Sequence, residues 1–364
     1  MKKQETKTHF LMKMLNSSLI DLPSPSSISF LWNMGFLLGM TLSLQIITGL
    51  MVSMHYTAET SAAFSSVIHI MRDVEAGWIT RFLHMNGASL FFILIYLHTA
   101  RGIYFSSPPK KPMVWTSGII LMVMTMAAAF LGYVLPWGQM SFWGATVITN
   151  IFSAIPMIGK TLVEWLWGNF SVSQPTLNRF FSLHFVIPMA IAAMMLVHLI
   201  ALHEGGSSNP TGTSTNMEKI KFHPMFMMKD ITPMVWISLA MLLLISKKPD
   251  LLGDVENLNT ANPLSTPVHI QPEWYFLFAY AILRSIPSKL GGVVALAMSI
   301  AILAILVSKK TLNTKFSPQK KTKMWILVST VTILTWIGAN PVEPPYEKIG
   351  QISSMAYFTS IITL

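Results

Sequence analysis

The chain has 364 residues, of which 52% are hydrophobic and only 11% are charged. This composition and a positive mean hydropathy exclude a water-soluble domain and indicate an integral membrane protein. The net charge of +10 does not indicate a nucleic-acid partner, because basic residues in the loops of a membrane protein report its topology. The absence of cysteine excludes disulfides, thiolate iron–sulfur clusters and covalent attachment of a c-type haem.

Eight apolar segments are long enough, or nearly so, to cross a bilayer as helices. We predict spans near residues 31–54, 77–104, 114–134, 180–202, 229–246, 288–308, 324–341 and 347–364, the last of which is barely long enough. The predicted fold class is all-α and polytopic. An N-terminal four-helix bundle is expected within residues 1–210, and a C-terminal four-span region within residues 211–364.

Four histidines form two pairs with the same internal spacing. His84 and His98 in the second predicted span, and His184 and His198 in the fourth, are each fourteen residues apart. Fourteen residues of α-helix rise about 21 Å and return to within about 40° of the same face. Two such helices side by side would present pairs of imidazoles at two membrane depths. The pattern favours noncovalent ligation of two haems by pairs of axial histidines.

Other interpretations of these histidines remain open. They could be structural groups that bond across helices, although packing gives no reason for two helices to share one interval. They could also form a proton relay in a transporter or channel, in which case the purified protein would be colourless. Chelation of one metal ion by a single pair does not fit, because its ligands would have to converge within a few ångströms.

Two pairs of glycines repeat the interval of the histidines. A porphyrin edge needs a helix surface without side chains, which glycine provides; close helix packing through small residues is the alternative. Alternate spans of an up-down bundle run antiparallel, so each glycine should lie level with one histidine. We expect Gly49 and Gly132 beside His84 and His184, and Gly35 and Gly118 beside His98 and His198.

Three arginines lie close in sequence to the histidines: Arg81, Arg101 and Arg179. A haem propionate is a carboxylate, which a guanidinium binds through two hydrogen bonds. We therefore predict that these arginines bind propionates. The alternative for each of them is an interfacial cation that anchors its helix.

The basic residues are distributed unevenly between the two sides of the predicted membrane topology. The side with the N-terminus and the loops after the second, fourth and sixth spans holds 16 of the 25 Lys and Arg residues and 5 of the 15 acidic residues. The strongest contribution is the run Lys309, Lys310, Lys315, Lys320, Lys321 and Lys323. The excess of basic residues predicts that both termini lie on the negative, matrix or cytoplasmic side. The polar N-terminal segment shows no cleavable signal.

Three loops are long enough to contribute to function. Residues 136–179 are apolar with few charges and predict short helices in the membrane interface. Residues 205–216 predict a flexible turn, since they are rich in Gly, Ser, Thr and Asn. Residues 247–287 begin polar and become aromatic after Pro272.

The chain resembles the cytochrome b family, the membrane subunits of ubiquinol:cytochrome c oxidoreductase, respiratory complex III in mitochondria. Besides the histidine pairs, the resemblance rests on GYVLPWGQMSFWGATVITN at 132–150, SAIPMIG at 153–159, LHEGGSSNPTG at 202–212, FHP at 222–224 and PEWYFLFAYAILRSIP at 272–287. By similarity, His84 and His184 would hold the low-potential haem near the positive side. His98 and His198 would hold the high-potential haem near the negative side.

The resemblance also implies two quinone pockets. Ubiquinol oxidation must release protons, and Glu273 is the candidate general base; the alternative is a carboxylate that caps a helix. Phe130, Tyr133, Gly144 and Tyr280 would line the same pocket. Ubiquinone reduction near the negative side would use His203, Asp230, Ser207 and Asn33. For Asp230 the alternative is a charge that compensates the dipole of a helix N-terminus.

The mechanism that the resemblance implies is a Q cycle in the mitochondrial inner membrane, with both termini on the matrix side. One electron would pass to an external iron–sulfur subunit and the other through both b haems to ubiquinone, with protons released on one side and taken up on the other. A cytochrome c-type subunit, membrane lipid and a second copy of the chain would be the further partners, with no nucleic acid. Another dihaem quinone-reactive subunit, such as that of a dehydrogenase, is the closest rival. Ser173 stands where relatives often have Asp.

Overall fold

The computed structural model describes residues 12–13, 16–309 and 316–364, and the described chain is predominantly helical. Lys310 and Lys315 of the predicted basic run lie outside the described residues. One two-stranded antiparallel sheet is the exception to the all-α prediction. It joins β1 (Pro23–Pro25) to β2 (Lys219–Lys221), with Ser24 opposite Ile220.

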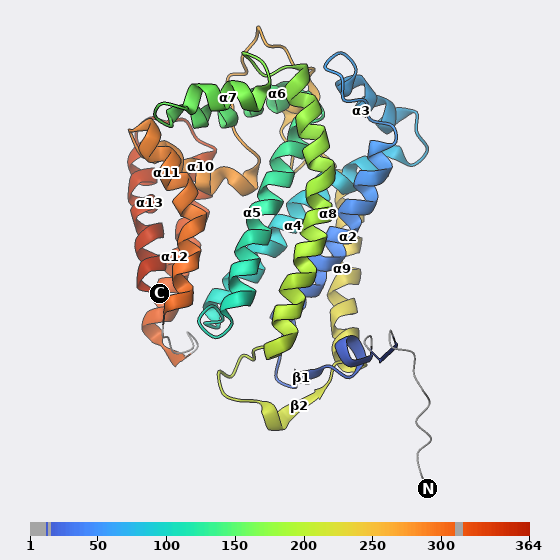
Figure 1. Cartoon of the computed structure of the whole chain (residues 1–364), viewed down its shortest axis with the longest axis vertical. Coiled ribbons are helices and arrows are strands. Elements are labelled where there is room, and N and C mark those ends of the chain that lie inside the picture. Colours follow the sequence, from blue (N-terminus) through green and yellow to red (C-terminus); the bar gives the residue numbers. More distant parts are fainter. Residues whose placement is uncertain (1–11, 14–15, 310–315) are drawn as a thin grey trace.

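Four long helices form a bundle in the N-terminal half (Figure 1). They are α2 (Met34–Ser53), α4 (Gly77–Tyr104), α5 (Pro112–Val134) and α8 (Gln174–Gly205). Helix α2 packs against α4, and α5 packs against α8. Because the chain alternates direction, α4 and α8 run parallel to each other and antiparallel to α2 and α5, as the predicted up-down topology requires (Figure 1).

Short helices cover the end of the bundle that lies opposite the sheet (Figure 1). They are α3 (Ala63–Arg72), α6 (Gln139–Asn150), the 3-10 helix η3 (Ile151–Ala154) and α7 (Gly159–Trp167). Helices α6 and α7 lie across the bundle axis, consistent with the interfacial helices predicted for residues 136–179. A core of Trp137, Phe142, Leu177 and Phe180 joins this layer to the start of α8.

Helix α8 begins directly after Ser173, the residue that stands where relatives often have Asp. Ser173 is the N-cap residue, and its backbone N–H donates to Thr176 Oγ1 at 3.1 Å. Serine caps helices about as well as aspartate does. The departure at Ser173 therefore preserves the start of the helix that carries His184 and His198.

The C-terminal half divides into two parts. Helix α9 (Met225–Lys247) packs against α4 and α2 of the N-terminal bundle. The other helices stand together on the far side of α5 (Figure 1): α10 (Leu277–Ser285), α11 (Lys289–Ala301), η7 (Ile302–Ser308), α12 (Pro318–Gly338) and α13 (Tyr346–Thr363). Ile282, Leu334 and Ile361 are fully buried in the core of this group. The domain boundary near residue 210 stays a prediction, since α9 belongs spatially with the first bundle.

Among the described residues, six helices are long and apolar enough to cross a membrane. They are Phe30–Ser53, Gly77–Tyr104, Pro112–Val134, Gln174–Gly205, Met225–Lys247 and Lys289–Ser308. Helices α12 and α13 coincide with the last two predicted spans but are more polar, because α12 begins with three lysines and α13 contains Glu347 and Lys348. The protein is thus a multi-pass membrane protein, and a total of eight spans stays a prediction.

Candidate functional site

The fold brings the four histidines together as two facing pairs. His84 on α4 faces His184 on α8, with ring centroids 6.2 Å apart, and His98 faces His198 at 6.4 Å. With metal–nitrogen bonds of 2.0–2.1 Å, two axial imidazoles have centroids about 6.3 Å apart. Both separations therefore fit one iron atom held between two rings. No cluster of three or more His, Cys, Asp or Glu side chains that could hold a metal ion occurs in the described chain.

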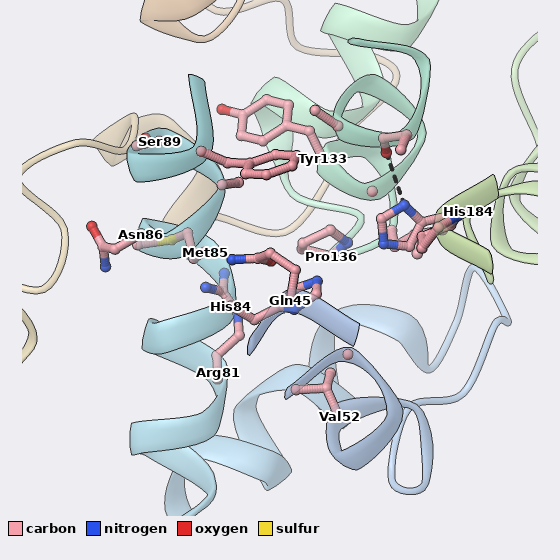
Figure 2. Close-up of a pocket in the computed structure, with 18 of the residues that line it drawn as sticks. Gln45, Val52, Arg81, His84, Met85, Asn86, Ser89, Tyr133, Pro136 and His184 are labelled. Atoms are coloured by element: carbon pink, nitrogen blue, oxygen red, sulfur yellow. Dashed lines mark hydrogen bonds between the residues drawn. The ribbon is translucent and has the colours of Figure 1, made fainter. Parts of the chain in front are cut away.

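The hydrogen bonds of the first pair engage Nδ1 of each ring and leave Nε2 available to bind a metal. The Thr48 hydroxyl donates to Leu44 O at 2.7 Å and is therefore left to accept from His84 Nδ1 at 3.0 Å. His184 Nδ1 donates to Ala128 O at 2.8 Å (Figure 2). With Nδ1 protonated in both rings, each Nε2 presents a lone pair for a metal.

In the second pair, only His198 is held in the same way. The Ser117 hydroxyl donates to Met113 O at 2.7 Å and accepts from His198 Nδ1 at 2.9 Å. At His98, in contrast, Nδ1 lies 3.1 Å from Nη2 of Arg101. A guanidinium can only donate, so metal ligation through Nε2 of His98 requires Arg101 to release this nitrogen. A carboxylate beside Arg101 would supply the alternative partner.

Each of the four glycines predicted to flank a haem lies against its expected histidine. An ideal Cβ atom would lie 2.9 Å from His84 Cε1 at Gly49 and would collide with His184 Cε1 at Gly132. At Gly118 and Gly35 it would lie 3.4 Å and 3.7 Å from Cε1 of His198 and His98. The glycines thus lie beside the histidines as predicted. At Gly49 and Gly132, the neighbouring imidazole leaves no space for a side chain.

A cavity surrounds the first histidine pair and extends toward residue 273 (Figure 2). His84 and His184 project into it from α4 and α8, and Gln45 of α2 enters from a third side. Three side chains on its wall carry buried polar atoms without a hydrogen-bond partner: Arg81 Nη1, Gln45 Nε2 and Asn86 Oδ1. Buried unsatisfied polar atoms are costly, and the two donors among them, Arg81 Nη1 and Gln45 Nε2, fit a bound group with acceptor oxygens. A haem propionate has this chemistry. Asn86 Oδ1 is itself an acceptor and would need a donor instead.

The other two arginines have different surroundings. Arg101 packs on the Trp32 ring at 5.4 Å beside the second pair and keeps a buried Nε without a partner. Arg179 donates to the carbonyl oxygens of Trp165 and Leu166 at the end of α7. It is not among the described residues that line the cavity. Arg81 and Arg101 thus lie at the two histidine levels, whereas Arg179 is engaged at the surface.

The segment of residues 272–275 (PEWY) reaches the cavity because its aromatic residues are anchored on α4. Tyr275 stacks on Phe92 with centroids 4.1 Å apart, and its carbonyl oxygen accepts from Tyr96. Trp274 Nε1 donates to Ser89 Oγ at 3.1 Å. Glu273, just before the 3-10 helix η6 (Trp274–Phe276), is thereby held at the cavity wall.

Glu273 shares this wall with Tyr133, and the interaction with the Tyr133 hydroxyl favours the charged form of the carboxyl group. Burial raises the pKa of the Glu273 carboxyl to about 7, against the opposing effects of Tyr133 and Arg81. A carboxyl group that titrates near neutral pH is suited to accept and release protons.

The other three residues predicted for this pocket are not among the described residues that line the cavity. Phe130 packs edge-on against Phe180, with centroids 5.8 Å apart. Gly144 on α6 faces open space, since no atom lies within 4 Å of an ideal Cβ. The Tyr280 ring on α10 lies against the Arg284 guanidinium at 4.5 Å.

The residues predicted for the second quinone pocket lie at the opposite end of the bundle. Asn33 Nδ2 donates to Lys229 O at 2.6 Å, which places it beside the buried Asp230 at the start of α9. His203 and Ser207 lie at the end of α8, where Gly206 N donates to His203 O at 3.4 Å. The structure brings Asn33 and Asp230 together, and it places the end of α8 at the same end of the molecule (Figure 1).

Four residues of the site were not predicted from the sequence. Thr48 and Ser117 each precede one of the paired glycines, so the sequences Thr48-Gly49 and Ser117-Gly118 carried a signal for them. Gln45 and Asn86 carried no such signal, because amides inside spans are common as helix-bonding groups.

Comparison with known proteins agrees with this geometry. Residues 19–206 match the family model described as Cytochrome b/b6/petB, and residues 260–358 match the model of Cytochrome b(C-terminal)/b6/petD. Among solved structures, the chain is similar to one described as a hyperthermophilic respiratory Complex III, with 29% sequence identity and a TM-score of 0.92. The match covers 98% of this chain and 96% of that chain. The chain therefore belongs to the cytochrome b/b6 family of membrane electron-transfer proteins that bind haem b.

Proposed function

We propose that this protein is the quinol-oxidising and quinone-reducing membrane subunit of a respiratory complex III. Membership of the cytochrome b/b6 family and the likeness to a complex III structure support a respiratory electron-transfer role. The observation that supports a two-haem subunit is the presence of two facing histidine pairs along one pair of helices. The ring centroids are 6.2 Å apart in one pair and 6.4 Å apart in the other. Such an arrangement would hold two one-electron carriers in series across a membrane.

Each haem b would be held noncovalently by one histidine pair and the glycines beside it. His84 and His184 would hold one, with Arg81 and Gln45 as partners for a propionate. His98 and His198 would hold the other, with Arg101 released from His98 toward a propionate. When bound, the haems supply reversible one-electron transfer; the protein supplies their placement and the fixed tautomers of three ligands.

Ubiquinol would be oxidised in the cavity beside the first pair. Glu273 would accept a proton from a ring hydroxyl, since burial raises its pKa to about 7 and the carboxylate form is then available at neutral pH. Tyr133 would hold the carboxyl group in place. Phe130, Gly144 and Tyr280 would bound the ring, with Gly144 leaving open space for it.

Ubiquinone would be reduced at the other end of the bundle. Asp230 and His203 would deliver the protons that the reduced ring needs, and Asn33 and Ser207 would supply hydrogen bonds. The 2.6 Å bond from Asn33 to Lys229 O supports this assignment, because it fixes a polar side chain beside the buried Asp230.

The remaining electron of ubiquinol would leave the chain. Since the sequence contains no cysteine, an iron–sulfur subunit must accept it, and a cytochrome c-type subunit would follow. We further propose a multisubunit homodimer in the mitochondrial inner membrane, with both termini on the matrix side and protons moved across the membrane by a Q cycle. The uneven distribution of basic residues supports this orientation.

Single-turnover haem reduction by ubiquinol tests the proposal in membranes that contain the whole complex. The wild type should show two b-type components in reduced-minus-oxidised spectra, whereas a colourless protein would support the proton-relay alternative. Glu273→Gln should slow reduction through the first cavity with haem content unchanged. Asp230→Asn should slow reoxidation of the haem between His98 and His198 instead. If Glu273→Gln impaired only the reaction at the Asp230 end, the assignment of the two pockets would be wrong.

A further inference from the structure

A third pair of histidines faces each other outside the bundle. His55 follows the end of α2, and His69 lies in the last turn of α3. Their ring centroids are 6.4 Å apart and their planes are tilted by 59°. Both residues are exposed, at the end of the molecule that α6 and α7 cover (Figure 1). Neither lines the haem cavity, and neither has a role in the proposed electron transfer.

The local structure holds the two segments against each other. The backbone N–H of Thr57 donates to Ser66 Oγ at 3.2 Å, which ties the segment after α2 to α3. Ser66, His69 and Asp73 share one face of α3, because residues three and seven positions apart on a helix lie on the same side. The hydrogen bond at Ser66 therefore keeps the segment that carries His55 on the face of α3 that carries His69.

His69 is arranged as a metal ligand with a carboxylate behind it. Its Nδ1 lies 2.9 Å from Oδ2 of Asp73, the C-cap residue of α3. This bond holds the proton on Nδ1 and leaves the Nε2 lone pair available, which is the usual arrangement behind a metal-bound histidine. With 53% of the His69 side chain exposed, a metal ion and its water molecules can reach Nε2. No nitrogen of the His55 ring has a hydrogen-bond partner among the described residues.

We propose that His55 and His69 form a surface site for a divalent transition-metal ion, with Zn²⁺ as the best-suited ion. Imidazole nitrogen is a preferred ligand of Zn²⁺, Cu²⁺ and Ni²⁺, and no competing thiolate exists in a chain without cysteine. For metal–nitrogen bonds of 2.0–2.1 Å, two imidazoles on one ion have centroids roughly 5 to 6.3 Å apart, depending on the angle at the metal. The observed 6.4 Å lies just beyond the upper end of this range. Rotation of the exposed His55 side chain would bring the rings within this range, and water would complete the coordination.

Packing of the two rings does not explain the pair. Aromatic rings attract each other at centroid separations of about 4.5–7 Å, but such contacts contribute little at a wet surface. Metal binding, in contrast, would link the end of α2 directly to α3. The residues around the link, Val52, Ser53, Tyr56 and Val67, line the outer wall of the cavity beside His84, so the ion would make this wall more rigid.

Isothermal titration with Zn²⁺ of the intact, haem-loaded complex in detergent tests the proposal. The wild type should bind one equivalent of Zn²⁺ that is lost in His55→Gln and equally in His69→Gln. The double variant should lose no more than either single variant, because both histidines hold the same ion. Asp73→Asn should weaken this binding by about tenfold or more, since it removes the partner of the first ligand.

His223→Gln is the matched control, since His223 is exposed near the sheet at the opposite end of the molecule. It should leave the His55–His69 equivalent unchanged. Single variants that bind Zn²⁺ like the wild type, or a double variant that loses two equivalents, would overturn the proposal.

Hydrogen exchange on the wild-type complex gives a second test that needs no variant. Zn²⁺ should slow amide exchange in residues 54–58 and 66–72 and leave residues 219–224 unchanged, because the ion closes the segment after α2 onto α3. Unchanged exchange in the first two segments at saturating Zn²⁺ would also overturn the proposal.

Discussion

The imidazole of His84 occupies the space that any side chain at Gly49 would need. An ideal Cβ at Gly49 would lie 2.9 Å from His84 Cε1, closer than real Cβ atoms come to other atoms. The neighbouring Thr48 accepts the Nδ1 proton of the same ring at 3.0 Å. Two consecutive residues of α2 thus set the position and the tautomer of one predicted haem ligand.

Gly49→Ala should disturb the haem bound by His84, because the added methyl group must displace the imidazole. Gly35→Ala should be tolerated, since its Cβ would meet His98 at an ordinary 3.7 Å. Gly39→Leu is the control on the same helix, as no atom lies within 4 Å of an ideal Cβ there. Reduced-minus-oxidised spectra of assembled complexes measure the effect. An unchanged spectrum for Gly49→Ala would assign this glycine to helix packing alone.

Replacement of the histidines should separate the two haem signals in pairs. His84→Ala and His184→Ala should each abolish the same component, because their rings face each other at 6.2 Å. His98→Ala and His198→Ala should each remove the other component. Optical redox titration distinguishes the two. Loss of the same component in His84→Ala and His198→Ala would contradict the pairing seen here.

Thr48→Val should raise the midpoint potential of the haem at His84 and weaken its retention. Valine keeps the shape of threonine but removes the acceptor for Nδ1, so the imidazole becomes a weaker donor to the iron; losses of this kind cost about 10–100-fold in metal affinity. Thr41→Val is the matched control, since Thr41 makes the same bond within α2, to Leu37 O at 2.8 Å, and has no hydrogen bond to a histidine among the described residues. Equal shifts in both variants would mean that the helix, and not the ligand, was altered.

The rate of ubiquinol oxidation should rise with pH through about 7. Burial raises the pKa of Glu273 to about 7, so the carboxyl is protonated below that pH and cannot accept a proton, whereas above it the carboxylate form is available. Loss of a general base typically costs about 10²-fold or more, and the pH dependence near 7 should disappear with it in Glu273→Gln. Stopped-flow haem reduction between pH 5.5 and pH 8.5, a range of about 1.5 units on either side of the pKa, measures both effects. A wild-type profile retained in Glu273→Gln would place the titrating group elsewhere.

Much of the site follows from residue spacing, because a helix converts sequence separation into depth and direction. The interval of fourteen in both histidine pairs and both glycine pairs required matching levels on four helices, and the structure has them. Apolar length and composition likewise predicted the six helices of the described chain that are long and apolar enough to cross a membrane.

Contacts between segments far apart in the chain depended on tertiary packing. Spacing placed Arg179 near His184, yet its side chain lies on the carbonyls at the end of α7, because α7 folds back beside the start of α8. Helix α9 joined the N-terminal bundle, and Glu273 reached the cavity only because Trp274 and Tyr275 are anchored on α4.

The sequence by itself therefore determined the membrane class, the helices and the four histidines with their glycines, since all of these depend on local periodicity. The tertiary structure decided which polar atoms complete the site, such as Thr48, Ser117 and Gln45, and it alone brought His55 to His69. The physical reason is that helical periodicity specifies the face on which a residue lies. The partner across that face is specified only when two helices pack.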